Sequence, residues 1–272
     1  MRMKNFHIDR FLRIVQWTER ASRREYLTVL AIMTAAFMVV FIGSLSFADS
    51  LTVEQSAEQL KHAVGSCSFA FFIYFCISGS WIFSNMTTRQ QSITFKMLPG
   101  SDLEKYLVRM VYTIVVWAAI GLLAFTIADI LRIIISLLTG ATWVQSGWPL
   151  FFDAWNGRWR MYNDGTLIAC GPHPLAVAGM MYVQSFYILG GTLLNRHKLL
   201  FTTIALFVMM TLALILLTHY QESISLINDM YPVRVMALAV LGVLILFTLI
   251  NYRLAYTLFV RKQIVNNKLF NV

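Results

Sequence analysis

The chain has 272 residues, of which 58% are hydrophobic and 13% are charged, and its mean hydropathy is +0.66. One soluble core of this size cannot bury so much apolar surface, so the composition excludes an ordinary globular protein and favours a bilayer as solvent. The net charge of +9 would suit nucleic acid only with a basic face on a soluble module, and the sequence contains no recognisable module of that kind.

Residues 1–26 predict an amphipathic interfacial helix on the cytoplasmic side. Its arginines are expected to meet anionic headgroups while its apolar face rests on the inner leaflet, although a plain membrane anchor fits the pattern equally well. The apolar run that follows has no small-residue cleavage site close behind it, so we expect it to remain as a signal-anchor. Residues repeating at i, i+3, i+4 and i+7 are Ile8, Phe11, Leu12 and Val15, opposite Asp9, Arg13, Gln16 and Arg20.

Six apolar stretches of 18 to 21 residues predict an all-α fold, one integral membrane bundle of six transmembrane helices. None of the six contains Asp, Glu, Lys or Arg. The predicted spans are 27–47, 63–83, 110–128, 175–194, 199–218 and 235–252, followed by a basic cytoplasmic tail at 253–272.

The distribution of positive charge predicts that both termini are cytoplasmic. Of the 22 Lys and Arg residues, 17 lie in the N-terminal segment, in the second-to-third and fourth-to-fifth connections, or in the tail. Only five lie on the other side. Because positive residues accumulate in cytoplasmic loops, this asymmetry predicts an N-in, C-in topology.

The cytoplasmic connection 84–109 predicts a docking element. Pro99 and Gly100 indicate a turn, after which Ser101 caps a new helix and Glu104 completes a capping box. Upstream, an otherwise polar and basic stretch carries several apolar side chains, and no soluble domain follows that could cover them. We expect these side chains to be exposed and to contact a partner protein. Alternatively, they lie against the inner leaflet of the membrane. They are Ile93, Phe95, Met97 and Leu98, with Lys96 between them.

The outer connection 129–174 opens with a predicted ion pair between Asp129 and Arg132, which lie three residues apart on one helical face. The apolar run 130–138 is too short to span and suits a helical extension of the third span or a short interfacial helix. The aromatic residues behind it are expected at the outer headgroups, with a substrate-binding cage as the alternative. They are Trp143, Trp148, Phe151, Phe152, Trp155 and Trp159.

Signatures of catalysis are absent from the sequence. It contains no GxxxxGK[ST], HExxH or GxSxG motif, and its histidines and carboxylates lack metal or triad spacing. We therefore expect no enzyme activity, no cofactor and no metal site. Gln184 is the polar residue we single out within the spans. Cys67 and Cys170 could both lie near the outer surface and pair, but inert apolar cysteines are the preferred interpretation.

The connection 84–109 resembles that of type-2 ABC exporter permeases, in which a short coupling helix precedes Leu-Pro-x-Ser and an acidic, then basic, helix start. The matching residues here are Met97-Leu98-Pro99-Gly100-Ser101 and Leu103-Glu104-Lys105. The amphipathic N-terminal helix, the six spans, the cytoplasmic termini and the basic tail are similar to the layout of this family.

The resemblance implies a permease subunit of an ATP-driven exporter in the bacterial cytoplasmic (inner) membrane. Its implied partners are a second permease subunit and a separate cytoplasmic ATPase. Members of this family commonly carry their outer hairpin helices between the fifth and sixth spans. In this sequence the longest outer connection lies instead between the third and fourth spans. A non-transporting scaffold, assembly or immunity protein with the same bundle is the alternative. The implied ATPase-coupling residues are Phe95, Lys96, Met97, Leu98, Pro99, Gly100, Ser101 and Glu104.

Overall fold

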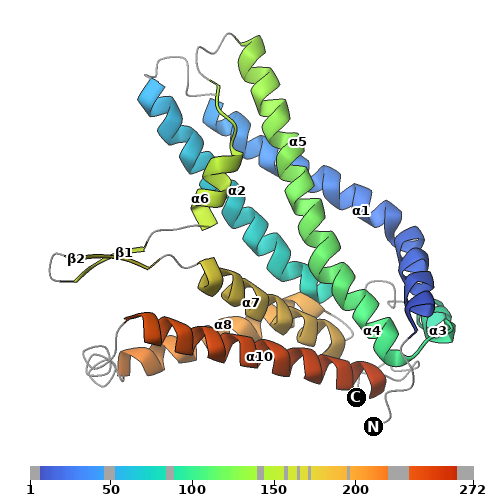
Figure 1. The fold of residues 1–272 in the computed structure, drawn as a ribbon. Coiled ribbons are helices and arrows are strands. Elements are labelled where there is room, and N and C mark those ends of the chain that lie inside the picture. Colours follow the sequence, from blue (N-terminus) through green and yellow to red (C-terminus); the bar gives the residue numbers. More distant parts are fainter. Residues whose placement is uncertain are drawn as a thin grey trace. The chain divides into compact units, whose positions relative to one another are not determined.

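The protein is an integral membrane protein whose described part is almost entirely helical (Figure 1). The structure, a computed structural model, describes residues 7–45, 53–83, 89–139, 144–155, 159–163, 166–170, 173–194, 197–219 and 233–261. Six helical stretches of this part are long and apolar enough to cross a membrane, which confirms the predicted number of spans. They are Ile8–Gly43, Glu54–Trp81, Asp102–Leu138, Pro174–Leu193, Lys198–Leu216 and Leu238–Arg261.

The described part of the chain contains nine α-helices. In chain order they are α1 (Ile8–Leu45), α2 (Val53–Ser78), α3 (Arg89–Met97), α4 (Asp102–Val111), α5 (Trp117–Leu138), α6 (Trp148–Trp155), α7 (His173–Leu193), α8 (Lys198–His219) and α10 (Val233–Arg261). A 3₁₀ turn at Gly79–Trp81 extends α2, and a π-helical turn at Tyr112–Val116 joins α4 to α5.

Several helices are longer than the spans that the sequence predicts. No break separates the expected interfacial helix from the first span, because α1 is one helix of 38 residues. The third span continues past residue 128, so the apolar run 130–138 is a helical extension, one of its two expected forms. The helix α10 likewise continues into the predicted tail as far as Arg261, and the rest of that tail lies outside the described residues.

One β-hairpin adds to the predicted all-α class. Strands β1 (Trp159–Asn163) and β2 (Thr166–Cys170) pair antiparallel, with Trp159 opposite Cys170 and Asn163 opposite Thr166. The hairpin lies in the connection 129–174, where composition and hydropathy predicted no strand.

The described residues form two compact units, which are treated separately below. Unit 1 comprises Met1–Gln16, Cys76–Thr113 and Pro174–Val272, and unit 2 comprises Trp17–Phe75 and Ile114–His173. The chain passes between them within α1, within α2, at the π-helical turn and at the start of α7.

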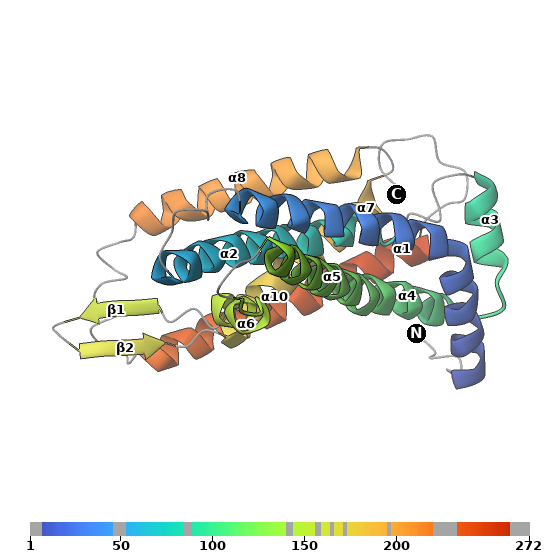
Figure 2. The ribbon, with the colours of Figure 1, turned by 90° about the horizontal axis from the view of Figure 1, so that it is seen from above.

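Close backbone packing holds the helices of unit 1 together. A Cβ at Gly79 would lie 2.6 Å from the Gln184 carbonyl oxygen, and one at Gly191 would lie 2.8 Å from the Ser80 carbonyl oxygen. The end of α2 and the helix α7 therefore approach backbone to backbone, as small residues allow in membrane helix pairs. On its other sides α7 contacts α8 and α10 (Figures 1 and 2).

An aromatic core fills unit 2. Phe125 of α5 packs against Phe37 and Phe41 of α1, with ring centroids 6.0 and 6.1 Å away. The Tyr74 hydroxyl of α2 donates to the Trp117 carbonyl at 3.0 Å, which fixes α2 against the start of α5. Such aromatic packing gives this unit a rigid apolar interior.

Candidate functional sites

The turn between α3 and α4 carries the predicted capping box. Ser101 is the N-cap of α4, its side-chain oxygen accepts from the Glu104 N–H at 3.2 Å, and Glu104 Oε2 accepts from the Ser101 N–H at 2.8 Å. Both bonds satisfy backbone donors that a helix start otherwise leaves unpaired, so the prediction is confirmed. The box fixes the direction in which the chain enters the third span.

Glu104 also fastens this turn to the beginning of α1. Its second oxygen, Oε1, accepts from the His7 N–H at 3.0 Å. Burial by itself would raise the pKa of the Glu104 carboxyl. The hydrogen bonds from His7 and Ser101, together with the charge of Arg10, outweigh burial and hold that pKa below its usual range. The carboxylate is therefore a charged clamp between two helix starts.

Two further contacts join α1 to the segment that runs from the α3–α4 turn to Tyr112. A Cβ at Gly100 would lie 2.7 Å from Ile14 Cδ1, so α1 packs directly on the turn. The Tyr112 hydroxyl donates to the Val15 carbonyl at 3.1 Å. The start of the N-terminal helix and the predicted docking connection are thus joined within unit 1.

The predicted exposure of Phe95 is wrong. Its side chain is only 1% exposed and lies edge-on to Phe259 of α10, with ring centroids 6.4 Å apart. Phe259 in turn stacks on Phe83 at 5.0 Å. Because α10 continues as a helix to Arg261, the end of the chain supplies the cover that we expected to be missing.

A different face of α3 is exposed. Met97 is 79% exposed, and Gln90 and Thr94, which precede it at helical spacing, are exposed as well. We call Gln90, Thr94 and Met97 the docking face. Of the other predicted coupling residues, Lys96, Leu98 and Gly100 are half-buried and Pro99 is exposed. The end of α3 is also bound to α4, because Lys105 donates from Nζ to the Lys96 carbonyl at 2.7 Å.

The predicted apolar face of the N-terminal helix is only partly covered. Phe11 and Val15 are half-buried, Ile8 and Leu12 are exposed, and Ile14, which we assigned to neither face, is the most buried of these side chains. Arg13 and Arg20 are exposed, as expected. The helix therefore has an uncovered apolar surface beside its arginines, which is compatible with a helix that rests on lipid.

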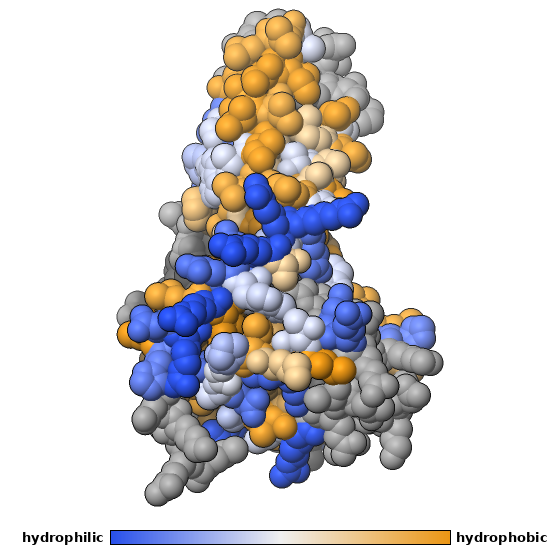
Figure 3. Space-filling view, turned by 90° about the vertical axis from the view of Figure 1, so that its right-hand side faces the viewer, coloured by the Kyte–Doolittle hydropathy of each residue, from blue (hydrophilic) through white to orange (hydrophobic). Residues whose placement is uncertain are grey.

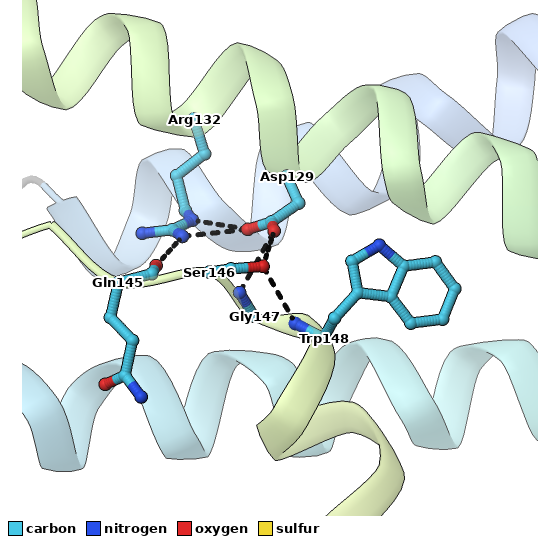
Figure 4. Close-up of polar contacts among 6 residues, drawn as sticks. All are labelled: Asp129, Arg132, Gln145, Ser146, Gly147 and Trp148. Carbon is cyan, nitrogen blue, oxygen red and sulfur yellow. Dashed lines mark hydrogen bonds and ion pairs between the residues drawn. The ribbon is translucent and has the colours of Figure 1, made fainter.

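The ion pair between Asp129 and Arg132 is confirmed, but it is buried. The two residues are 2% and 5% exposed, and the closest N–O distance is 2.8 Å (Figure 4). Asp129 Oδ1 accepts from Nε and a terminal nitrogen of Arg132. Asp129 Oδ2 accepts from the Ser146 hydroxyl and the Gly147 N–H, both at 3.0 Å. Each oxygen of the Asp129 carboxylate thus accepts two hydrogen bonds, one for each of its lone pairs.

The same network holds the chain that enters α6. Arg132 donates to the Gln145 carbonyl, and the Ser146 side-chain oxygen accepts from the Trp148 N–H at 3.3 Å, at the start of that helix (Figure 4). A Cβ at Gly147 would lie 3.1 Å from Asp129 Oδ1 and 3.2 Å from Val64, so the turn packs tightly against both residues. We call these six residues, 129, 132 and 145–148, the outer clasp.

The aromatic side chains of α6 lie in different environments. Phe151 is 2% exposed and its ring centroid lies 4.5 Å from that of Phe125, so its predicted place at the headgroups is wrong. Phe152 is 55% exposed and stacks on the half-buried Trp148 at 5.4 Å. From Phe125 to Leu138 the helix α5 rises about 20 Å. The chain therefore turns back along α5 instead of spreading over its end.

Some predicted outer residues cannot be placed. Trp143 lies outside the described residues, as do the side chains of Trp155, Trp159 and Cys170. The proposed pairing of Cys67 with Cys170 therefore stays untested. Within the described part, Cys67 and Cys76 are free and buried.

Polar groups within the spans of unit 1 bind one another. Gln184 is fully buried and donates from Nε2 to the Thr113 carbonyl at 3.2 Å and to the Ser78 hydroxyl at 3.4 Å. Asn251, a polar residue that the sequence interpretation overlooked, donates to the Ser185 hydroxyl at 3.0 Å. These bonds join α7 to its neighbours and serve helix packing.

A metal site among the described side chains would need several His, Cys, Asp or Glu residues close together. No group of three or more His, Cys, Asp or Glu there could hold a metal ion. His62 and His219 are exposed, and the side chain of His173 lies outside the described set.

Comparison with known proteins finds no matching family model, no matching curated protein and no matching solved structure.

Proposed function

We propose that the chain is the membrane-spanning permease subunit of an ATP-driven, ABC-type exporter, with both termini in the cytoplasm. It would pair with a second permease subunit and with a separate cytoplasmic ATPase. The observation that carries the proposal is the joint around Glu104, where a short helix with an exposed docking face is tied to two long apolar helices. An ATPase pushing on α3 would move both of them.

Three connections support a mechanical role for α3. The capping box joins its end to α4, which continues through the π-helical turn into α5. Glu104 and the contact of Ile14 with Gly100 join the same turn to α1. Phe95 joins α3 itself to the end of α10 through Phe259. A displacement of α3 would therefore reach α4, the start of α1 and the end of α10, all within unit 1.

The buried polar groups of the spans suggest the kind of cargo. Gln184 and Asn251 donate to neighbouring helices, and the apolar residues of α8 and α10 are extensively exposed. A hydrophobic or lipid-like molecule needs no polar route, so it fits these spans better than an ion or a sugar does.

The same polar groups favour the second candidate, a non-transporting scaffold, assembly or immunity protein. The amide nitrogens of Gln184 and Asn251 bind neighbouring helices, a packing role that a protein without cargo would use as well. The two candidates differ in one respect that can be measured, because a scaffold needs no ATPase.

The test is recovery of a P-loop ATPase with the detergent-extracted protein. Met97→Asp places a charge at the C-terminal end of the docking face without touching the core, since Met97 is exposed. If the face docks an ATPase, losing this contact costs about 2 kcal/mol, roughly thirtyfold in affinity.

The matched control is His62→Asp, which introduces the same charge at an exposed position near the start of α2. It should leave recovery unchanged at equal membrane abundance. Equal recovery from wild type and Met97→Asp would remove the coupling role of α3. Absence of any P-loop ATPase from the wild-type preparation would favour the scaffold.

A further inference from the structure

Three arginines project from α1 just before its apolar section. Arg20, Arg23 and Arg24 are all exposed, and in the described part of the chain none of them forms an ion pair. Helical geometry places Arg20 and Arg24 on one face with Arg23 at its edge, and it puts Glu25 about a quarter turn away from Arg24. Glu19 lies one turn before Arg23 on the same side, but no ion pair joins these two residues in the described part of the chain. The face of Arg20 and Arg24 therefore has no paired carboxylate in the described part of the chain.

The position of these arginines along α1 matches the edge of a bilayer. The next residue on the same face is Leu27, and exposed apolar side chains continue from there through Ile32 and Val39 to Ile42. That section rises about 23 Å, most of the thickness of the hydrocarbon layer. Figure 3, which views the molecule from the side where α1 lies, shows hydrophilic side chains projecting next to an apolar surface.

An aromatic pair lies at the same level of unit 2. Tyr26 is half-buried and its ring meets Trp117 edge-on, with centroids 6.1 Å apart. Tyrosine and tryptophan concentrate where headgroups meet hydrocarbon, because each has one polar edge and an apolar body. Trp117 is only 4% exposed and packs inside unit 2, so Tyr26 is the member of this pair that can meet headgroups at the level of Arg20, Arg23 and Arg24.

We propose that Arg20, Arg23 and Arg24 bind the phosphate of an anionic phospholipid in the leaflet that surrounds this end of α1. A planar guanidinium matches two phosphate oxygens at once, and three of them favour a headgroup with net negative charge over a zwitterionic one. The exposed Leu27 beneath them offers apolar contact for the acyl chains. An acidic surface of a soluble protein would use the charges but not this apolar continuation.

The site goes beyond the proposed function, because a scaffold would bind the same lipid. It is also separate from the docking face, whose residues are uncharged. Anionic lipid would fix the depth of α1 in the membrane, so that movement of α3 bends or tilts helices instead of lifting α1 out of the bilayer.

The test compares retention of phosphatidylglycerol and phosphatidylcholine. Wild type and the triple variant Arg20→Gln, Arg23→Gln, Arg24→Gln are placed in nanodiscs containing equal amounts of the two lipids. They are then released into detergent, and native mass spectrometry counts the lipids that remain bound. Wild type should retain phosphatidylglycerol preferentially, and the variant should lose at least tenfold of that preference, because each arginine near a charged headgroup contributes roughly fivefold.

Two further comparisons separate charge at this site from charge elsewhere. Arg253→Gln with Arg261→Gln, at exposed positions of α10, should keep the wild-type preference. Adding millimolar inorganic phosphate should not displace the lipid, because phosphate alone lacks acyl chains. Displacement by phosphate would mean an ion site instead of a lipid site and would overturn the proposal.

A measurement on wild type alone guards against a variant that fails to fold. Raising the salt concentration from about 0.05 to 0.5 M should abolish most of the phosphatidylglycerol preference, since screening weakens exposed charge pairs. An unchanged preference at high salt, or equal preference in the wild type and the triple glutamine variant, would overturn the proposal. If the variant instead loses an ATPase but keeps the lipid, the three arginines bind protein.

Discussion

Two buried carboxylates on one helical run hold the chain in different ways. Glu104 lies at the start of α4 and Asp129 lies near the end of α5, and each fastens a turn of the chain to the helix that carries it. Asp129 is neutralised by Arg132 from its own helix, at 2.8 Å. Glu104 accepts from the backbone N–H groups of Ser101 and His7, and the positive charge of Arg10 also acts on it.

We infer from this difference that the Asp129 network stays closed, whereas the contacts of Glu104 can open. The outer clasp is closed within unit 2, because its cation, its carboxylate and its turn are neighbours in the chain and are surrounded by Phe41, Val64 and Phe125. Glu104 instead joins residues far apart in the chain through two backbone amides, which water could satisfy if the joint opened. We expect the outer clasp to be static and the joint around Glu104 to be where movement enters.

Breaking the outer clasp should lower the free energy of unfolding more than removing the charge of Glu104. Arg132→Met leaves the Asp129 charge buried without its cation, which costs about 3–5 kcal/mol of unfolding free energy. Thermal unfolding in detergent micelles, followed by the loss of monodisperse protein, measures the change.

The control is the double variant Asp129→Asn, Arg132→Met, in which no buried charge remains. It should recover at least half of the lost stability, because Asn can still accept from Ser146 and Gly147. If the double variant is as unstable as the single one, Arg132 acts through packing against Phe41 and not through charge.

Removing the charge of Glu104 should have a smaller effect that depends on pH. Glu104→Gln weakens hydrogen bonds to a charged acceptor, a loss of about 2 kcal/mol at pH 7. The pKa of this carboxyl is lower in the folded protein than its ordinary value of 4.5. Its contribution is therefore complete above pH 4.5 and is lost as the pH falls through the folded value.

Thermal unfolding of wild type and Glu104→Gln at pH 7 and at pH 3.5 tests this sign. The advantage of wild type should shrink on acidification. Asp102→Asn, in the same first turn of α4 but outside the capping box, serves as the control and should change stability little. A wild-type advantage that grows at low pH would contradict the clamp assigned to Glu104.

Local patterns in the sequence predicted the features that depend on near neighbours. The capping box needs only Ser101 and Glu104, the ion pair needs only Asp129 and Arg132, and each span shows its own apolar length. The burial of Phe95 could not be predicted in this way, because Phe259 lies near the other end of the chain. The aromatic pattern of α6 also fits a headgroup belt, and only the position of Phe125 shows that Phe151 turns inward.

The most direct test of the account is the side of the membrane on which the docking face lies. In a variant whose three cysteines are replaced by alanine, single cysteines are introduced at Met97 and at Asp153, both exposed positions. In intact cells an impermeant maleimide should label the cysteine at 153 and should label the one at 97 only after permeabilisation. The reverse pattern would place α3 outside the cell, out of reach of any cytoplasmic ATPase, and would contradict the proposed function.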